Sequence, residues 1–163
     1  LEAAEGATKV FAINLRPPFV DRTVIDASMG HAALVKINDD ELDVLRGWYG
    51  LPADDQAAAE ALLDRFDLDT LCVTRGAHGA WLWHEGQHWS HAGFDVTVAD
   101  TVGAGDSFLA MLLAEARKGS DGAAMLDAAN RLGAYVASQE GATPEYDRAT
   151  IEAAVTDGQR RER

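Results

Sequence analysis

The stretch Asp100-Thr101-Val102-Gly103-Ala104-Gly105-Asp106-Ser107-Phe108 joins two apolar segments and decides how the rest of the chain is interpreted. Residues 94–98 before it can form a strand, and residues 107–117 after it have the composition of a buried helix. The first N–H groups of a helix lack acceptors inside the helix and carry a partial positive charge, so a glycine-rich turn at this place suits a phosphate group. The stretch therefore predicts an anion-binding turn that carries Asp106.

Apolar runs that predict buried strands alternate with helical patterns along the chain. The strands are expected at residues 10–13, 33–37 and 70–74, and the helices at a capped segment starting at Asn38 and at residues 54–66, 107–117 and 121–139. A hairpin is expected over residues 80–90, with its turn at Glu85-Gly86. This alternation predicts an α/β fold with a mainly parallel, three-layer (Rossmann-like) sheet and an antiparallel hairpin at one edge.

The composition is that of a globular protein with an acidic excess. The 163 residues fit one domain, and the 27 acidic and 14 basic residues give a formal net charge of -13. This charge disfavours binding to the phosphate backbone of nucleic acids. No apolar run reaches the roughly 18 residues that a membrane-spanning helix needs. The one cysteine, Cys72, allows no internal disulfide, so a reducing cytoplasm is the expected compartment.

Asp106 is the first candidate for chemistry in the turn. A carboxylate beside a bound phosphate group can take the proton from a hydroxyl whose oxygen attacks phosphorus. A helix cap is the alternative interpretation, because Asp at a helix start commonly only accepts backbone hydrogen bonds.

Three rival motifs do not match the same region. A dinucleotide-binding fingerprint requires a third glycine where Phe108 stands, and the chain contains no Gly-x-x-x-x-Gly-Lys-Ser/Thr loop. Residues 105–108 also resemble the nucleophile block of the GDSL esterases, which would make Ser107 catalytic. Those enzymes require a late Asp-x-x-His, and none of the five histidines has Asp three residues before it.

Five short segments match, in order, the motifs of one enzyme family. They are an Asn-x-Arg element at residues 14–17, an Asn-x-x-Glu motif at 38–41, a Thr-x-Gly loop at 74–79, the turn at 100–108, and a pair formed by Ala129-Asn130 and residues 141–144. Together they resemble the PfkB (ribokinase-like) family of sugar and nucleoside kinases, over about residues 10–150. The resemblance implies the ribokinase-like α/β fold.

The resemblance implies roles for the residues at the turn and at the Asn-x-x-Glu motif. Asp106 is the expected catalytic base, and the expected anion hole for the transferred phosphoryl group is the backbone of Gly103, Ala104 and Gly105. Asn38 and Glu41 are expected to act on Mg²⁺ and the phosphates through water, which agrees with the waters that Mg²⁺ retains in proteins. A helix capping box is the alternative for this pair.

Other matching residues are expected to bind nucleotide, sugar or a cation. Those expected at the nucleotide are Thr74, Gly76, Gly79 and Asn130, the last facing the adenine. An Asn in an alanine-rich helix is otherwise exposed or bonded locally. Arg16 is expected at the sugar or its phosphoryl-acceptor region, with a surface arginine as the alternative. Asp100 and the carbonyl of Val102 fall where some members bind a monovalent cation such as K⁺.

The implied activity is that of a sugar kinase, most like fructokinase, which transfers the γ-phosphoryl group of ATP to a sugar hydroxyl. A 2-keto-3-deoxygluconate or nucleoside kinase of the same family stays open, as does a nucleotide-binding domain without activity. Residues 1–163 are expected to be the C-terminal part of a single kinase domain, with the N-terminal half and its lid outside the sequence. This part alone is expected to be inactive, and a homodimer of the complete protein is compatible with the resemblance.

Two further features are expected to have no role in catalysis. Residues 84–88 match the zinc-protease pattern His-Glu-x-x-His, but the central glycine and the alternating tryptophans around it predict a hairpin turn rather than the helix that the motif needs. Cys72 lies among apolar neighbours and is interpreted as a small buried hydrophobic residue.

Overall fold

The computed structural model describes residues 6–155, which fall into two compact units. The first unit holds Leu1–Thr74 and Leu82–Gln87, and the second holds Arg75–Trp81 and His88–Arg163. Each unit has buried apolar side chains of its own.

Three parallel strands form the centre of the first unit. They are β1 (Val10–Ala12), β2 (Leu34–Asn38) and β3 (Thr70–Thr74). The middle strand is β2, in which Val35 lies opposite Phe11 on one side and Leu71 on the other. Most side chains of β2 and β3 are buried, which explains why both strands appear in the sequence as near-continuous apolar runs. The prediction of buried strands is confirmed for β2 and β3. β1 is a strand as predicted, but its side chains are half-buried or exposed, so its predicted burial is wrong.

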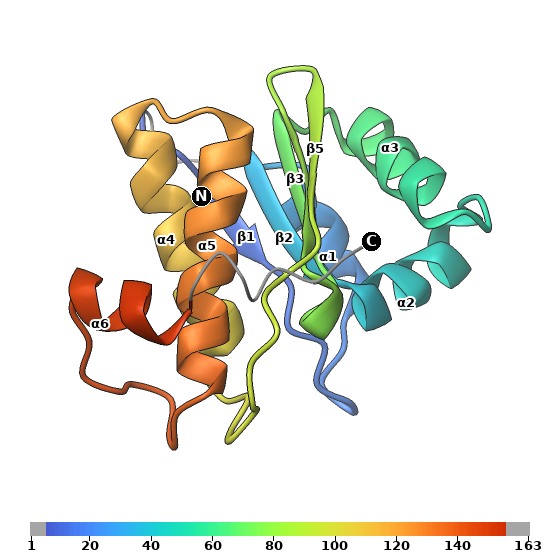
Figure 1. Cartoon of the computed structure of the whole chain (residues 1–163). Helices are drawn as coiled ribbons and strands as arrows, with labels where there is room; N and C mark the ends of the chain where they lie inside the picture. Colours follow the sequence, from blue (N-terminus) through green and yellow to red (C-terminus); the bar gives the residue numbers. More distant parts are fainter. Residues whose placement is uncertain (1–5, 156–163) are drawn as a thin grey trace. The chain divides into compact units, whose positions relative to one another are not determined.

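Three helices accompany these strands in the first unit. They are α1 (Arg22–Met29), α2 (Asp39–Tyr49) and α3 (Asp55–Phe66). α2 contacts β2 and β3, and α3 contacts β3 (Figure 1). The positions of α2 and α3 confirm the prediction. α1 is not predicted by the pattern, because its eight residues are too few to show a clear apolar period.

A hairpin completes the sheet, whose strand order is β1-β2-β3-β4-β5. β4 (Ala80–His84) and β5 (Gln87–His91) are joined by Glu85 and Gly86, whose φ angles are 49° and 71°. Only antiparallel neighbours can be joined by so short a link, and positive φ at both residues is the geometry of a type I′ turn. The protein thus has the predicted α/β fold, with parallel strands and an antiparallel hairpin at one edge.

Two long helices dominate the second unit. Its elements are the 3-10 helix η1 (Gly76–His78), α4 (Ala104–Lys118), α5 (Gly122–Ala137) and α6 (Arg148–Ala154). α4 and α5 pack along each other, and α6 contacts α5 (Figure 1). Their core contains Phe94, Leu132, Tyr135, Val136, Ile151 and Val155.

The second unit corrects two sequence predictions. Residues 94–98 do not form a strand: Phe94 is buried in the core, whereas Val98 is 56% exposed, so the apolar run does not lie on one sheet face. α4 begins at Ala104, three residues before the expected start, so Asp106 is inside the first helical turn. α6, which the pattern does not predict, has only seven residues.

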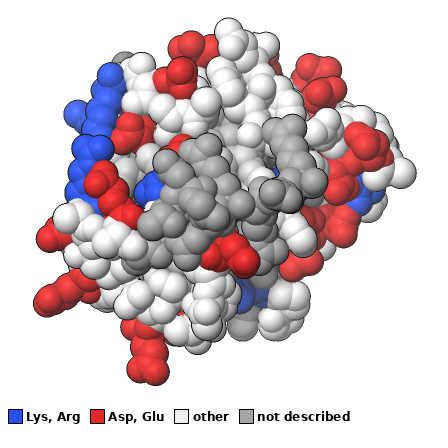
Figure 2. All heavy atoms as spheres, in the orientation of Figure 1, with Lys and Arg blue, Asp and Glu red and all other residues white. Residues whose placement is uncertain are grey.

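The acidic excess is visible on the surface. Figure 2 shows Asp and Glu side chains spread over the face in view, with Lys and Arg in fewer places, as expected for 27 acidic and 14 basic residues. Among the described residues, no helix is long and apolar enough to cross a membrane.

Candidate active site

The start of α4 is held by a close contact between two backbone segments. Gly103, the residue before the helix, has φ 80°, and a Cβ at this position would lie 2.4 Å from the carbonyl oxygen of Ala142. Only glycine tolerates both this φ and this contact. The structure therefore brings the predicted anion-binding turn against residues 141–144, another segment that resembles a family motif.

The first turn of α4 differs from the other helix starts that the structure describes. At the start of each of the other five α-helices, the side chain of the N-cap residue accepts hydrogen bonds from backbone N–H groups. These N-cap residues are Asp21, Asn38, Asp54, Asp121 and Asp147. Among the α-helices within residues 6–155, α4 alone has no such side-chain cap. The Ala104 N–H donates to Thr101 O at 3.3 Å, and the other N–H groups of the first turn can bind an anion.

Asp106 is not the cap of α4. It is the third residue of the helix, and its side chain is exposed. Since the residue before the helix is Gly103, the simple N-cap interpretation of Asp106 is wrong. The carboxylate is therefore free of that structural role and lies in the turn whose N–H groups can hold a phosphoryl group.

Asp100 and Val102 are linked to each other before the turn. The N–H of Val102 donates a hydrogen bond to Asp100 Oδ1 at 3.0 Å, which shapes this part of the loop locally. The monovalent-cation site expected at Asp100 and the Val102 carbonyl stays a prediction.

A backbone hydrogen bond closes the predicted nucleotide loop, residues 74–79. Arg75 N–H donates to the carbonyl oxygen of Gly79 at 2.8 Å, and η1 lies between them. Gly79 has φ 77°, and a Cβ there would lie 2.0 Å from His91 O and 2.4 Å from Gly93 N. The structure thus explains Gly79 by its contact with residues 91–93, whereas Gly76 is exposed and has open space around it.

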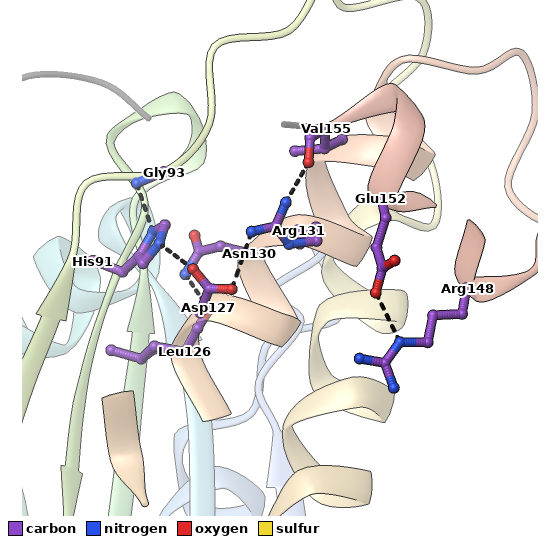
Figure 3. A network of polar contacts seen from close by, with 9 residues as sticks. All are labelled: His91, Gly93, Leu126, Asp127, Asn130, Arg131, Arg148, Glu152 and Val155. Atoms are coloured by element: carbon purple, nitrogen blue, oxygen red, sulfur yellow. Dashed lines mark hydrogen bonds and ion pairs between the residues drawn. The ribbon is translucent and has the colours of Figure 1, made fainter. Parts of the chain in front are cut away.

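Asn130 is buried in α5 and bonded within its own helix. Its side chain is 8% exposed, and Nδ2 donates to Leu126 O at 2.8 Å (Figure 3). A local bond of this kind is the alternative to the adenine contact that was predicted for Asn130. The adenine contact expected for Asn130 stays a prediction.

In the first unit, Asn38 and Glu41 form a reciprocal capping box at the start of α2. Asn38 Oδ1 accepts the Glu41 N–H at 2.7 Å, and Glu41 Oε2 accepts the Asn38 N–H at 2.9 Å. Glu41 Oε1 also accepts the N–H of Leu15 at 3.2 Å, which fixes the loop after β1 to this helix start. The alternative interpretation of the pair as a helix cap is confirmed, and the role at Mg²⁺ stays a prediction.

The remaining predicted residues of the first unit lie at strand ends. Thr74, the last residue of β3, donates through Oγ1 to Ile37 O at 3.2 Å. Arg16 is exposed, in the loop after β1. That loop borders a shallow apolar pocket of about 280 Å³, lined by Leu15, Pro17, Pro18, Val20, Val44 and Trp48.

The hairpin predicted around His84 and the burial predicted for Cys72 are confirmed. His84 and His88 lie on the two arms of the hairpin, not on a helix, and His84 Nδ1 is 2.8 Å from Thr70 Oγ1. No group of three or more His, Cys, Asp or Glu side chains able to hold a metal occurs within residues 6–155. Cys72 is fully buried, and burial raises the pKa of its thiol to about 12.

Sequence reasoning missed the residues that support these sites. Gly93, which faces Gly79, carries no chemical group that indicates a site. Ala142 lies in the matching segment 141–144, but its contact with Gly103 was not predicted. Gly93 has φ 85°, a conformation that glycine adopts more readily than other residues. The presence of glycine at position 93 was the one sequence signal for this turn.

Comparisons with known proteins give the same family throughout. The family model described as pfkB family carbohydrate kinase matches residues 1–148. A fructokinase from Rhizobium leguminosarum bv. trifolii is 35% identical over 117 residues, which are 68% of this chain and 34% of that protein.

Solved structures agree. A fructokinase double mutant from Vibrio cholerae O395, bound to fructose, ADP and potassium ion, has a TM-score of 0.72 and 28% identity, covering 90% of this chain and 50% of that one. An aminoimidazole riboside kinase from Salmonella enterica has a TM-score of 0.67 and 31% identity, covering 82% of this chain and 46% of that one.

The chain thus spans between about a third and a half of the length of these relatives. The family match covers most of the chain, and the folds agree over at least 82% of it. The chain belongs to the pfkB family of carbohydrate kinases.

Proposed function

We propose that this chain is the C-terminal, nucleotide-binding part of a ribokinase-like sugar kinase that phosphorylates a sugar hydroxyl with ATP. One observation carries the proposal: α4 begins without a side-chain cap, and exposed Asp106 lies in its first turn. An uncapped helix start binds an anion, and a carboxylate next to that anion can accept a proton.

The backbone and Asp106 have different roles in the proposed transfer step. The backbone N–H groups of residues 103–105 hold the negative charge of the phosphoryl group as it is transferred, which lowers the barrier most when these groups are already in position. Asp106 takes the proton from the sugar hydroxyl while that oxygen attacks the γ-phosphorus of ATP in line, and the bond from this phosphorus to ADP breaks, so that ADP leaves.

The proposed nucleotide contacts are those that the resemblance implies. They are Thr74, Gly76, Gly79 and Asn130. ATP is the expected phosphoryl donor, because relatives with this fold include kinases solved with ATP and Mg²⁺ or with ADP and potassium ion.

Mg²⁺ fits the first unit in the indirect way that the sequence predicted. Glu41 is 5% exposed and its two oxygens already accept the N–H groups of Leu15 and Asn38, so the carboxylate is fixed in direction and can accept a further bond from a water. Asn38 and Glu41 would hold the ion through water, and the ion would neutralise phosphate charge when bound. Asp100 and the Val102 carbonyl are proposed for a monovalent cation such as K⁺.

Fructose or a related sugar is the proposed acceptor, with Arg16 at the acceptor region. Fructokinase relatives at 35% and 34% identity support this choice. A nucleoside is the second candidate acceptor, favoured by the aminoimidazole riboside kinase at 31% identity. We further propose a cytoplasmic protein that binds neither nucleic acid nor membrane and is able to form a homodimer when complete.

The test is phosphoryl transfer by the complete gene product and by residues 1–163 alone. With MgATP and a panel of sugars and nucleosides, we expect the complete product to turn over fructose or a close relative at about 1–100 per second. Residues 1–163 alone should bind MgATP weakly and turn over no acceptor efficiently, because transfer requires both reactants to be held in line. Ester hydrolysis without ATP use, or nucleotide binding without transfer by the complete product, would contradict the proposal.

A further inference from the structure

A polar network in the second unit connects the two proposed nucleotide-binding elements. It starts at His91, the last residue of β5, and runs through Asp127 and Arg131 of α5 to the carbonyl oxygen of Val155, as Figure 3 shows. Asp127 lies three residues before Asn130 on the same helix, so the two side chains lie on neighbouring parts of one helix face.

The main chain of His91 supports the nucleotide loop. Its carbonyl oxygen occupies the place where a Cβ on Gly79 would stand, at 2.0 Å from that point. The N–H of Gly93, which also faces Gly79, donates to His91 Nδ1 at 2.9 Å. The conformation of residues 91–93, which Gly79 fits against, is thus fixed by the histidine ring.

The same ring reaches α5 from its other nitrogen. Because Nδ1 accepts the Gly93 N–H, the neutral ring carries its proton on Nε2, and Nε2 lies 3.4 Å from Asp127 Oδ1. The second carboxylate oxygen of Asp127 accepts a hydrogen bond from Arg131 at 3.2 Å, so Asp127 is held in direction. The His91 side chain is only 11% exposed.

Phe94 covers this contact on one side. Its ring lies 5.1 Å from the ring of His91, and the guanidinium carbon of Arg131 lies 4.6 Å from its centre. Polar contacts that are partly removed from water in this way are stronger and more directional than exposed ones. The network is therefore suited to hold two elements at a fixed separation.

We propose that His91 is a positioning residue for nucleotide binding, which couples the loop of residues 75–79 to α5 and thereby to Asn130. His91 does not touch the nucleotide: its main chain supports the loop and its ring anchors the helix. This inference rests on the proposed function, since it assigns the loop and α5 to the nucleotide.

The experiment measures MgADP affinity by calorimetry in the complete gene product. His91→Ala and Asp127→Ala should each raise the Kd for MgADP about fivefold to tenfold, the usual effect of one lost hydrogen bond. Because both residues act through one contact, the Kd of the double variant for MgADP should be no higher than the higher Kd of the two single variants. The KM for the sugar should stay unchanged. His88→Ala, the same change at an exposed position of β5, should leave the Kd unchanged.

His91→Asn serves as a second variant if His91→Ala does not fold. Its shorter side chain can still accept the Gly93 N–H but does not reach Asp127, so it should fold normally and still bind MgADP more weakly. Equal affinities in the folded His91 variants and the wild type would overturn the inference alone. So would effects that multiply in the double variant, or a sugar KM that rises with the Kd. Failure of the wild-type protein to bind MgADP would overturn the proposed function together with this inference.

Discussion

At the scale of the single residue, glycine occurs at two positions at the start of α4 for different physical reasons. Gly103 has a positive φ and the Ala142 carbonyl oxygen where a Cβ would stand, so the fold itself requires glycine. Gly105 is exposed at the second position of the helix, where a helix former such as Ala would be more stable. We expect a ligand that approaches the backbone to be the reason for glycine at this second position.

Gly105→Ala should therefore change stability and binding in opposite directions. We expect the free energy of unfolding to rise by up to about 1 kcal/mol, because Ala has the higher helix propensity. MgADP affinity and turnover should fall, because a methyl group then lies beside the N–H groups that bind phosphate. Thermal denaturation and calorimetry check both effects, with Ala110→Gly, at an exposed position within α4, as the control that lowers stability and leaves affinity unchanged. A more stable Gly105→Ala variant with wild-type affinity would show that no ligand approaches this glycine.

At the scale of the element, the capping box of α2 gives Glu41 a structural role that can be separated from a role at Mg²⁺. Gln at the third helical position also completes a capping box, so Glu41→Gln should leave the fold and its stability nearly unchanged. If the carboxylate orients water at the ion, the same change should lower kcat by about 10–100-fold, as is usual for residues one shell away from a metal. Steady-state kinetics over a range of Mg²⁺ concentrations measure this. Asp54→Asn at the start of α3 is the matched control, and an unchanged kcat in Glu41→Gln would leave only the cap.

The start of α6 should be sensitive to acid. Hydrogen bonds from the Thr150 backbone and hydroxyl lower the pKa of Asp147 below its ordinary value of 3.8. A lowered pKa means that the carboxylate stabilises the folded helix above pH 3.8, and that this contribution is lost as the pH falls through the lower folded value. The protection of α6 amides against hydrogen exchange, relative to the intrinsic exchange rate at each pH, should therefore fall at the acid end of this range. Asp147→Asn, which caps without titrating, should abolish the pH dependence; the same acid response in that variant would assign it to another group.

Patterns that depend on neighbouring residues were predictable from the sequence, and those that depend on distant packing were not. The runs at 33–37 and 70–74 are apolar because the strands are buried, so their positions followed directly. Residues 94–98 carry large apolar side chains at alternate positions, a pattern typical of a strand. Phe94 instead packs in a core with residues of α5 and α6, and no strand forms. The capping box at Asn38 was visible in its spacing, whereas the Leu15 contact of Glu41 joins residues 26 apart and gave no sequence signal.

At the scale of the whole molecule, the catalytic assignment depends on more than this chain. The chain spans 34% of the Rhizobium fructokinase. The described residues do not define the acceptor pocket, which belongs to the proposal for the complete protein. What the chain itself contributes is the uncapped start of α4 with Asp106, the loop at 75–79, and α5. The central claim is that Asp106 acts as a base during phosphoryl transfer.

Asp106→Asn in the complete gene product tests this claim most directly, by measuring kcat and MgADP affinity together. Asn keeps the size and a hydrogen-bond acceptor but removes the proton acceptor, so kcat should fall by about 10²–10⁴-fold. MgADP affinity should be unchanged or slightly higher, because the N–H groups remain and a negative charge beside the phosphates is lost. Asp121→Asn, the same change at the N-cap of α5, should alter neither quantity. A folded Asp106→Asn enzyme with near-normal kcat would contradict the assignment.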